Sequence, residues 1–423
     1  MKALCVSAIA SNQGKTILTT ALLYHFKNSV RPFKIGPDYI DPQFHKAICQ
    51  TQSINLDSFI MNKEQVQWTF NHYSDKKFSI LEGVMGFYDG MDKGSSAYDV
   101  TTFLDIPTVL LLDGSGSYIT ISAVLKGLKT YEKDNTIKAV ILNKLSSSMH
   151  YALIKKQIES DFDDIEVLGW IQKDIQALKD THLGLDLINA NKTILETISK
   201  AVLENIDLER LETVSSYKKQ ENSTYPFSKF KQTEKKLTII KDKNFSFIYY
   251  DNIQFLKEVF KTVEFVNPSL DETINSDSDV VYIPGGYVET PLAYESIKDS
   301  HKFKESLIEH AKTKHVYAEC AGLLYLGNRV DDKKMSSILD VDFTLTQKRA
   351  RLGYYFASSG LKGHAFHYTK PVNEDKHDGV DILSKKPQGK GEYGSWQNNN
   401  VFGTYLHTMF RNNINTIKDY FGI

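Results

Sequence analysis

The sequence predicts an α/β protein of two domains, each built on a mostly parallel β-sheet. The chain has 423 residues, more than one hydrophobic core usually holds. Short runs rich in Val, Ile, Leu and Phe alternate with segments of helical apolar spacing, which is typical of βαβ units. This alternation breaks at residues 215–236 and then starts again, which places a domain boundary there.

In the first half, compact apolar runs predict buried strands at 2–10, 30–35, 78–81, 108–112 and 138–142. Between them, the apolar spacing is helical, most clearly at 16–27 and 119–130. In the second half the same patterns predict strands at 245–250, 279–283 and 315–318, and a helix over 252–263. Strands that alternate with helices favour a parallel sheet covered on both faces.

Residues 215–236 contain no Val, Ile or Leu, and 8 of these 22 residues are charged. Such a segment cannot line a core, so we expect an exposed linker. The expected domains are therefore 1–214 and 237–423.

Composition excludes several classes of protein. The 51 basic and 52 acidic residues give a net charge of −1, so nothing favours a nucleic-acid or polybasic membrane partner. No apolar run approaches the roughly 18–20 residues of a membrane-spanning helix, and residues 1–10 do not resemble a signal peptide. The three cysteines lie far apart, which argues against a disulfide framework or a paired-cysteine zinc site. We therefore expect a cytoplasmic protein.

A phosphate-binding loop is predicted at 11–16 (SNQGKT), between a strand and a helix. Backbone N–H groups at such a helix start point at phosphate oxygens, Lys15 adds a positive charge, and the Thr16 hydroxyl can hold Mg²⁺. The usual pattern has a glycine five residues before Gly14, where this chain has Ile9, and Asn12 is expected to supply the left-handed turn. The alternative is a capped helix start with an exposed lysine.

Acidic residues follow two predicted strands. Lys34, Asp38 and Asp41 lie in the segment 33–42, and Glu82 and Asp89 lie in the segment 81–90. Ligands of open parallel sheets bind at the carboxyl ends of the strands, so these acids are expected to face the phosphates and a metal ion. The alternative for each acid alone is a helix cap or a turn.

A second site is predicted around Cys320, which follows a short strand and precedes small residues. A strand-to-helix elbow exposes a nucleophile there, and the backbone N–H of Ala321 lies just beyond it. The glycine-rich turn at 284–287 offers a second N–H, at Gly286, for an oxyanion hole. His407, 87 residues after the cysteine, is the candidate base. Alone, each of these residues is more often an ordinary core residue.

Three runs resemble the cobyrinic acid a,c-diamide synthases: FKIGPDYIDPQFH at 33–45, NLDSF at 55–59 and EGVMGFYDG at 82–90. These are ATP-dependent, glutamine-using amidases of the corrin pathway, whose first domain is similar to dethiobiotin synthetase. The resemblance continues through VILNK at 140–144 and HLGL at 182–185. The runs PGGY, AECAGLLYL and YLH resemble class I glutamine amidotransferase domains.

The resemblance implies a P-loop-type sheet domain followed by a flavodoxin-like amidotransferase domain, with Cys320 as nucleophile and His407 as its base. It implies ATP binding by Asn12, Gln13, Gly14, Lys15, Thr16, Lys34 and Asn143, with Asn143 at the adenine. It places Asp38, Tyr39, Asp41 and Asp89 at the substrate and the transferring phosphoryl group, and Mg²⁺ on Thr16, Asp41 and Glu82.

One position departs from the wider glutaminase class and two depart from the family. Many class I glutaminases have a glutamate two residues after the histidine, where this chain has Met409. The family that the chain resembles also lacks this glutamate, so a Cys–His dyad is expected. Thr181 stands where the family usually has arginine, and Ala365 where it usually has glutamate. His364 and His367, on either side of the segment 365–366, are candidates to face the corrin or a domain interface, and the alternative is an ordinary structural role.

The expected reaction is amidation of the a and c acetate carboxylates of cobyrinic acid through acyl phosphates, in cobalamin biosynthesis. The partners would be a tetrapyrrole carboxylate, ATP and L-glutamine, and a homodimer is compatible with this reaction. Nickel sirohydrochlorin or hydrogenobyrinate could replace cobyrinate with the same chemistry. Two alternative hypotheses come from other functional classes. One is a P-loop regulatory ATPase with a degenerate second domain, and the other is a stand-alone cysteine hydrolase.

Overall fold

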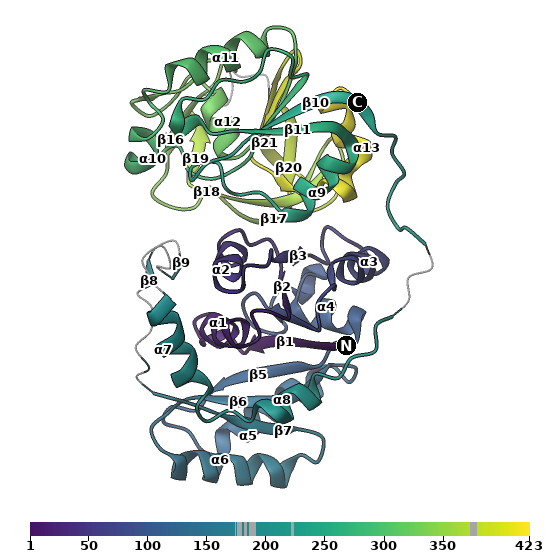
Figure 1. Ribbon diagram of the computed structural model, residues 1–423, viewed down its shortest axis with the longest axis vertical. Helices are drawn as coiled ribbons and strands as arrows, with labels where there is room; N and C mark the ends of the chain where they lie inside the picture. Colours follow the sequence, from purple (N-terminus) through teal and green to yellow (C-terminus); the bar gives the residue numbers. More distant parts are fainter. Residues whose placement is uncertain (174, 176–179, 182–183, 186–191, 221–223, 373–378) are drawn as a thin grey trace. The chain divides into compact units, whose positions relative to one another are not determined.

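The computed structural model describes residues 1–173, 175, 180–181, 184–185, 192–220, 224–372 and 379–423. The chain divides into two compact units, Met1–Pro226 and Phe227–Ile423 (Figure 1). Among the described helices, none combines the length and apolar character needed to cross a membrane.

The first unit is built on a seven-stranded parallel sheet in the order β3-β2-β4-β1-β5-β6-β7. Its strands are β1 (Lys2–Ala8), β2 (Val30–Ile35), β3 (Ile54–Leu56), β4 (Phe78–Glu82), β5 (Thr108–Asp113), β6 (Ile137–Leu145) and β7 (Glu166–Gln172). Its helices are α1 (Lys15–His25), α2 (Ile40–Cys49), α3 (Lys63–Tyr73), α4 (Ala97–Leu104), α5 (Ile119–Tyr131), α6 (Ser148–Asp161), α7 (Lys192–Leu203) and α8 (Leu208–Val214). A two-stranded ribbon pairs β8 (Asp180–Thr181) with β9 (Gly184–Leu185).

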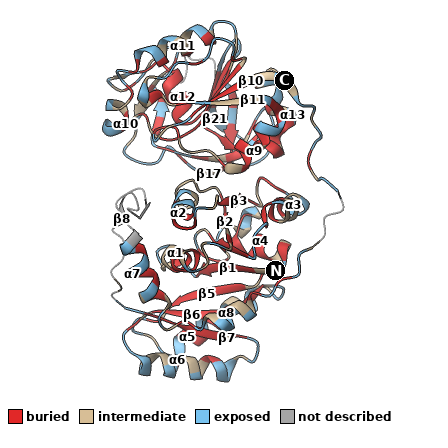
Figure 2. Ribbon diagram, viewed as in Figure 1, coloured by how far each residue is buried: buried red, intermediate tan, exposed pale blue. Residues whose placement is uncertain are grey.

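The strands of this sheet are buried almost throughout, whereas the helices expose their outer faces (Figure 2). β1 lies at the centre of the sheet, where it pairs with β4 on one side and β5 on the other. Its buried apolar side chains on both faces suit this position. The phosphate-loop segment therefore begins at the middle of the sheet, where ligands of such folds bind.

The second unit has a ten-stranded mixed sheet in the order β11-β10-β12-β13-β22-β21-β20-β17-β18-β23. The first five strands run parallel, and the rest continue antiparallel. The sheet strands are β10 (Thr233–Ile240), β11 (Phe260–Val266), β12 (Val280–Ile283), β13 (His315–Glu319), β17 (Arg351–Ala357), β18 (Lys362–His367), β20 (Gly379–Ser384), β21 (Gly391–Asn398), β22 (Val401–Thr404) and β23 (His407–Thr408). A smaller sheet holds β14 (Arg329–Val330), β15 (Lys333–Lys334), β16 (Asp342–Leu345) and β19 (Thr369–Pro371). The helices are α9 (Tyr250–Val259), α10 (Pro291–Glu295), α11 (His301–Ala311), α12 (Ala321–Leu326) and α13 (Phe410–Tyr420).

The α/β class predicted from the sequence is confirmed in both units. Several elements of the second unit were predicted wrongly. Residues 245–250 form a loop that enters α9, and the helix expected over 252–263 ends at Val259, because the β-branched and aromatic residues that follow form β11. The segment 215–236 is also less open than expected: Ser215 and Tyr217 are buried, and β10 already begins at Thr233.

Candidate functional site

The loop between β1 and α1 has the backbone of an anion-binding turn. Asn12 has a φ of 60° and Gly14 a φ of 94°, so the left-handed turn expected at Asn12 is confirmed. The Lys15 ammonium folds back over the loop and donates to the carbonyl of Ala10 at 2.8 Å. Burial, and then the charge of Lys34, lower the pKa of Lys15. The first N–H groups of α1 have no partner within the helix, so they can bind a ligand that carries negative charge.

Asn143, near the end of β6, holds this loop in place. Its side-chain amide donates to the Gln13 carbonyl at 2.9 Å, and its oxygen accepts from the Lys144 N–H at 2.8 Å. A Cβ atom on Gly14 would lie 2.7 Å from the Asn143 amide nitrogen, so glycine is required there. The adenine contact expected of Asn143 stays a prediction.

Lys34, the fifth residue of β2, lies at the centre of three carboxylates. Its ammonium pairs with Asp41, with Glu82 at 3.3 Å and with Asp38 at 3.6 Å, and its side chain is 3% exposed. Burial alone would lower the pKa of Lys34, but the three carboxylates outweigh it and raise the pKa well above its usual range. Lys34 is therefore a fixed positive charge beside the loop.

Glu82, the last residue of β4, connects this cluster to the loop and to α2. One of its oxygens accepts from the Thr16 hydroxyl at 2.8 Å, and the other lies 2.9 Å from Nε2 of His45. The second His45 nitrogen, Nδ1, lies 3.0 Å from the Ser53 hydroxyl, so both sides of this buried ring are fixed. Burial would raise the pKa of Glu82, but Lys34 and His45 lower it below its usual range.

The residues predicted to hold Mg²⁺ are oxygen donors of the kind that this ion prefers. Thr16 and Glu82 are in direct contact, and Asp41 reaches the same lysine as Glu82. Burial raises the pKa of Asp41. Within the described residues, no group of three or more His, Cys, Asp or Glu side chains is arranged as a metal site. The set therefore fits an ion that takes its remaining ligands from phosphate and water, as Mg²⁺ does with nucleotides.

The turn between β2 and α2 positions two further predicted residues. The Asp38 carboxylate accepts from the N–H groups of Ile40 at 2.8 Å and Asp41 at 3.1 Å, and so fixes the start of the helix. Asn55 donates to the carbonyl of Asp38 at 2.8 Å from the neighbouring β3. Tyr39 occupies the N-cap position of α2. The structure thus brings Asp38 and Asp41 to Lys34, with Tyr39 between them in the chain.

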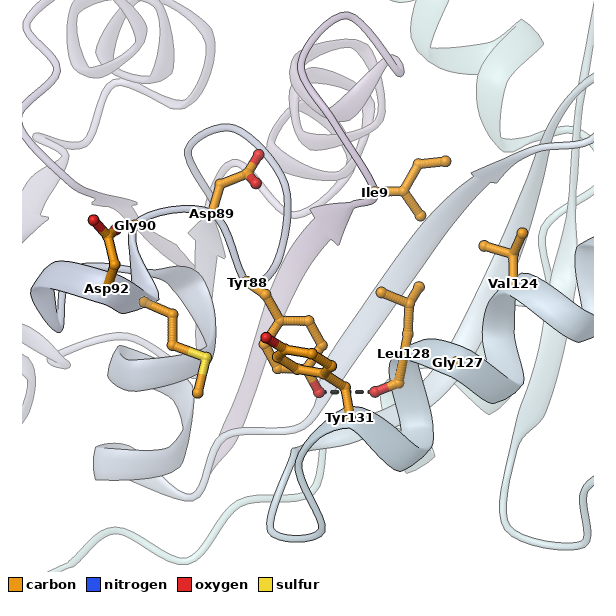
Figure 3. Close-up of a pocket in the computed structure, with 10 residues that line it drawn as sticks. Ile9, Tyr88, Asp89, Gly90, Asp92, Val124, Gly127, Leu128 and Tyr131 are labelled. Atoms are coloured by element: carbon orange, nitrogen blue, oxygen red, sulfur yellow. Dashed lines mark hydrogen bonds between the residues drawn. The ribbon is translucent and has the colours of Figure 1, made fainter.

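Asp89 lines an open cavity of about 690 Å³, and its charge also acts on Lys15. Its carboxylate accepts from the Gly86 N–H at 2.8 Å. Figure 3 shows this carboxylate on the side of its loop away from the rings of Tyr88 and Tyr131, whose centroids are 5.0 Å apart. The Tyr88 hydroxyl donates to the carbonyl of Leu128, which closes the cavity floor against α5.

In the second unit, Cys320 occupies a strained turn between β13 and α12. Its φ of 46° and ψ of −102° lie outside the regions that an L-residue ordinarily adopts. Its N–H donates to the Thr404 carbonyl at 2.7 Å, and a Cβ atom on Gly322 would lie 2.4 Å from the Ile283 carbonyl. The close packing of neighbouring strands therefore maintains the strain, as at a nucleophile elbow.

The structure brings His407 to Cys320. Burial alone would lower the pKa of His407, but a hydrogen bond with Cys320 and the nearby Glu319 carboxylate raise it to about 9. His407 is buried, so a proton held on its ring is shielded from bulk water. This arrangement favours an imidazolium beside the Cys320 sulfur near neutral pH.

Sequence reasoning did not find Glu319. Its carboxylate lies 3.7 Å from Nδ1 of His407, and both side chains are buried. The available signal was an acid at the end of the apolar run HVYA, directly before the nucleophile. The residue two positions after the histidine is Met409, the N-cap of α13, so no acid occupies that position.

The two N–H groups expected to form an oxyanion hole lie on adjacent loops. Gly286 follows β12 and Ala321 follows β13, which pair in parallel through Ile283 and Ala318. In the described part of the chain, neither N–H donates to another residue. Gly286 has a φ of 150°, and a Cβ there would lie 1.8 Å from the Asn244 carbonyl.

The departures from the family pattern have different surroundings. Ala365 is completely buried in the core, opposite Gly353 of the neighbouring strand. His367 is also buried, with its ring stacked on Tyr405 at a centroid distance of 3.7 Å, and His364 pairs with His407 across β18 and β23. Thr181 lies in β8, and the run at 182–183 lies outside the described residues.

Two family models match the chain. Residues 4–185 match the CobQ/CobB/MinD/ParA nucleotide binding domain, and residues 236–414 match the CobB/CobQ-like glutamine amidotransferase domain.

Full-length relatives carry the name cobyrinate a,c-diamide synthase. The protein of Fusobacterium nucleatum subsp. nucleatum is 32% identical over 451 residues, with 100% of both chains covered. That of Saccharolobus solfataricus is 33% identical and covers 97% of this chain and 98% of its own. That of Methanococcus maripaludis is 32% identical and covers 96% of each. Among solved structures, chloroplast FtsY from Physcomitrella patens aligns with 47% of this chain and 65% of its own. The sequence identity is 14% and the TM-score is 0.31.

Proposed function

The chain belongs to the CobB/CobQ family and is a glutamine amidotransferase ligase of the cobyrinate a,c-diamide synthase type, and from this premise we propose its substrate and mechanism. The substrate is cobyrinic acid, whose a and c acetate carboxylates are amidated in turn. Glutamine supplies the nitrogen, and ATP activates each carboxylate. A P-loop regulatory ATPase with a degenerate second domain does not agree with this family membership.

The first unit activates the carboxylate. A carboxylate resists attack by ammonia because oxide is a poor leaving group, and transfer of the γ-phosphoryl group of ATP converts it into an acyl phosphate. Lys15, above the loop, and Lys34, held by its three carboxylates, offset the charge that develops during this transfer. Thr16, Asp41 and Glu82 would hold Mg²⁺, which would supply further charge neutralisation. Asp38, Tyr39 and Asp89 lie on the loops after β2 and β4 and contact the substrate.

The second unit releases ammonia. The Cys320 thiolate attacks the side-chain amide carbon of glutamine, and the N–H groups of Gly286 and Ala321 stabilise the oxyanion. His407 gives its proton to the departing nitrogen, so that ammonia leaves and a thioester remains on Cys320. Water then attacks the thioester, His407 takes up a proton, and glutamate leaves.

Coupling the two reactions in one chain has a physical advantage. Ammonia is mostly protonated in water at neutral pH, and ammonium is not a nucleophile. Delivery without release to bulk water keeps the amine neutral and raises its effective concentration at the acyl phosphate.

The observation that carries the proposal is that one chain combines a buried lysine–carboxylate cluster beside a phosphate loop with a buried Cys320–His407 pair. The test supplies ATP, Mg²⁺ and glutamine with cobyrinate, hydrogenobyrinate or nickel sirohydrochlorin, and identifies the products by mass spectrometry. A diamide from cobyrinate with formation of ADP is the expected result. A product from only another macrocycle would move the proposal to that substrate, and no product from any of them would refute it.

Cys320→Ser is the matched variant for this test. It should lose glutamine-dependent synthesis and keep synthesis with ammonium salts, because the activating unit is untouched. Turnover of glutamine that needs neither ATP nor acceptor, without any amide product, would favour a stand-alone cysteine hydrolase.

A further inference from the structure

The base of the second unit has a neighbour whose role is not yet explained. His407 presents Nδ1 to an oxygen of Glu319 at 3.7 Å, and the two side chains are 3% and 2% exposed. This distance is that of an ion pair and is longer than a hydrogen bond. A buried carboxylate is costly unless it interacts with donors or positive charge, so its place beside the ring needs a reason.

The other partners of Glu319 fix it without neutralising it. The Tyr282 hydroxyl donates to one oxygen at 3.0 Å, and the Thr408 N–H and the Tyr317 hydroxyl donate to the other at 3.3 and 3.4 Å. The pKa values of both tyrosines are raised by burial and by the charge of Glu319, so they stay protonated donors. Three donors from β12, β13 and β23 therefore aim the carboxylate at His407.

The chain geometry explains how an acid and a thiol reach one ring. Glu319 ends β13, and the strained φ of 46° at Cys320 turns the next side chain in a new direction. Consecutive residues thus contact His407, with the thiol and the carboxylate in the two outer positions of a thiol–imidazole–carboxylate series. Among the described residues, nearby ionisable groups include His364, whose backbone pairs with that of His407 across β18 and β23, and His367, whose pKa is lowered to about 3, mainly by burial.

We infer that Glu319 is the positioning residue of the glutaminase centre: it orients the His407 ring and stabilises its protonated form, in place of an acid after the histidine. In this role Glu319 transfers no proton, and the proton moves only between His407, the leaving ammonia and water. This inference rests on the glutaminase half of the proposed function and is independent of the identity of the macrocycle.

Glu319→Gln tests it, because the amide keeps the size of the side chain and removes its charge. Glutamine hydrolysis, measured with ATP and acceptor present, should lose about 10²-fold or more in kcat with little change in KM. Synthesis with ammonium salts should remain at the wild-type rate. Asp381→Asn, which removes another buried carboxyl of the same unit, held by Ser358 and Ser359, should leave glutamine hydrolysis unchanged.

A pH profile separates positioning from mere support of the fold. Without the Glu319 charge the imidazolium is less stable, so the pH midpoint of Cys320 thiolate formation, followed by the rate of iodoacetamide alkylation, should rise in Glu319→Gln. Glu319→Asp, which retains the charge, should have a higher kcat than Glu319→Gln and a pH midpoint closer to that of the wild-type chain. If Glu319→Gln fails to fold, Tyr282→Phe, which removes one donor from the carboxylate, should lower kcat less and shift the midpoint in the same direction.

The outcomes are distinct. An unchanged kcat and an unchanged midpoint in Glu319→Gln would overturn the inference, as would an equal loss of glutamine- and ammonium-dependent synthesis. If the wild-type chain amidates no macrocycle, the proposed function fails, but the alkylation midpoint still decides the role of Glu319.

Discussion

Gly285 lies directly against the imidazole ring of His407: a Cβ atom at position 285 would be 2.1 Å from Cε1 of that ring and 3.0 Å from Nδ1. The absence of a side chain on the turn after β12 is therefore a condition for the position of the base. The same turn continues into Gly286, so one short segment determines both where the ring lies and where an oxyanion donor lies.

Gly285→Ala should consequently lose glutamine-dependent synthesis by about 10²-fold or more, because the ring must move away from Cys320. Synthesis with ammonium salts measures the first unit and should be unchanged. A variant with normal glutamine hydrolysis would show that the ring can be displaced without cost, and would contradict the geometry of the pair.

Alkylation should distinguish the three cysteines. Burial raises the pKa of Cys5 to about 12 and also raises that of Cys49, so both are thiols at neutral pH. Cys320 lies beside the protonated His407 ring and should react first with iodoacetamide at neutral pH, as peptide mass spectrometry would show. Glutamine should protect it. Preferential labelling of Cys49, or labelling that glutamine does not slow, would argue against a thiolate at position 320.

Lys34→Met should destabilise the first unit by roughly 3–5 kcal/mol, because it leaves the carboxylates of Asp38, Asp41 and Glu82 without their central cation. A divalent cation can partly replace the lost charge. Added Mg²⁺ should therefore raise the melting temperature of Lys34→Met more than that of the wild-type chain. Equal effects of Mg²⁺ on the two proteins would indicate that these carboxylates do not share a cation.

Metal removal should affect only the first unit. EDTA should abolish synthesis from ATP with either nitrogen source, while alkylation of Cys320 continues. Thr16→Val, which keeps the side-chain shape and removes the hydroxyl that contacts Glu82, should raise the Mg²⁺ concentration needed for half-maximal synthesis. A Mg²⁺ requirement identical to that of wild type would remove Thr16 from the metal site.

The pKa of His407 gives a signed prediction for stability. The group has a pKa of about 9 in the folded chain, above the 6.5 of a free histidine. Its proton therefore contributes stability that is fully present below pH 6.5 and is lost as the pH rises through about 9. The difference in unfolding free energy between wild type and His407→Asn should narrow from pH 7 to pH 10.

His310→Asn is the control for this measurement. Burial lowers the pKa of His310 to about 4, so the ring is neutral across the same range and its contribution should stay constant. If the difference in unfolding free energy from wild type narrows equally in both variants between pH 7 and pH 10, the pH dependence belongs to another group.

Local patterns in the sequence pointed to candidate residues of both sites on short motifs, and the structure has each motif at or directly after the end of a strand. The phosphate loop, the acids after β2 and β4 and the cysteine elbow all follow this rule. Glu319 and His45 were missed because their hydrogen-bond partners come from distant elements: Thr408 on β23 for one, and Glu82 on β4 for the other. The two residues of each pair lie on different elements, so no residue spacing in the sequence predicts their contact.

The antiparallel half of the second sheet was missed for a similar reason. Strands such as β17 and β21 are interrupted by glycine and carry polar residues, so their apolar alternation is weak. The helix expected through residue 263 shows the same limit, since the β-branched and aromatic residues of 260–266 form a strand by pairing with β10, which lies earlier in the chain.

The order of strands in the second unit has a consequence for how its activity arises. The thiol follows the fourth strand, β13, and the base lies on the tenth, β23, with five strands between them. In a flat sheet these two strands would lie about 29 Å apart. The sheet must therefore curl until its far edge returns to its middle. A polypeptide that has not yet added its final edge strand holds a thiol with no base, so ammonia release begins only when this unit has finished folding.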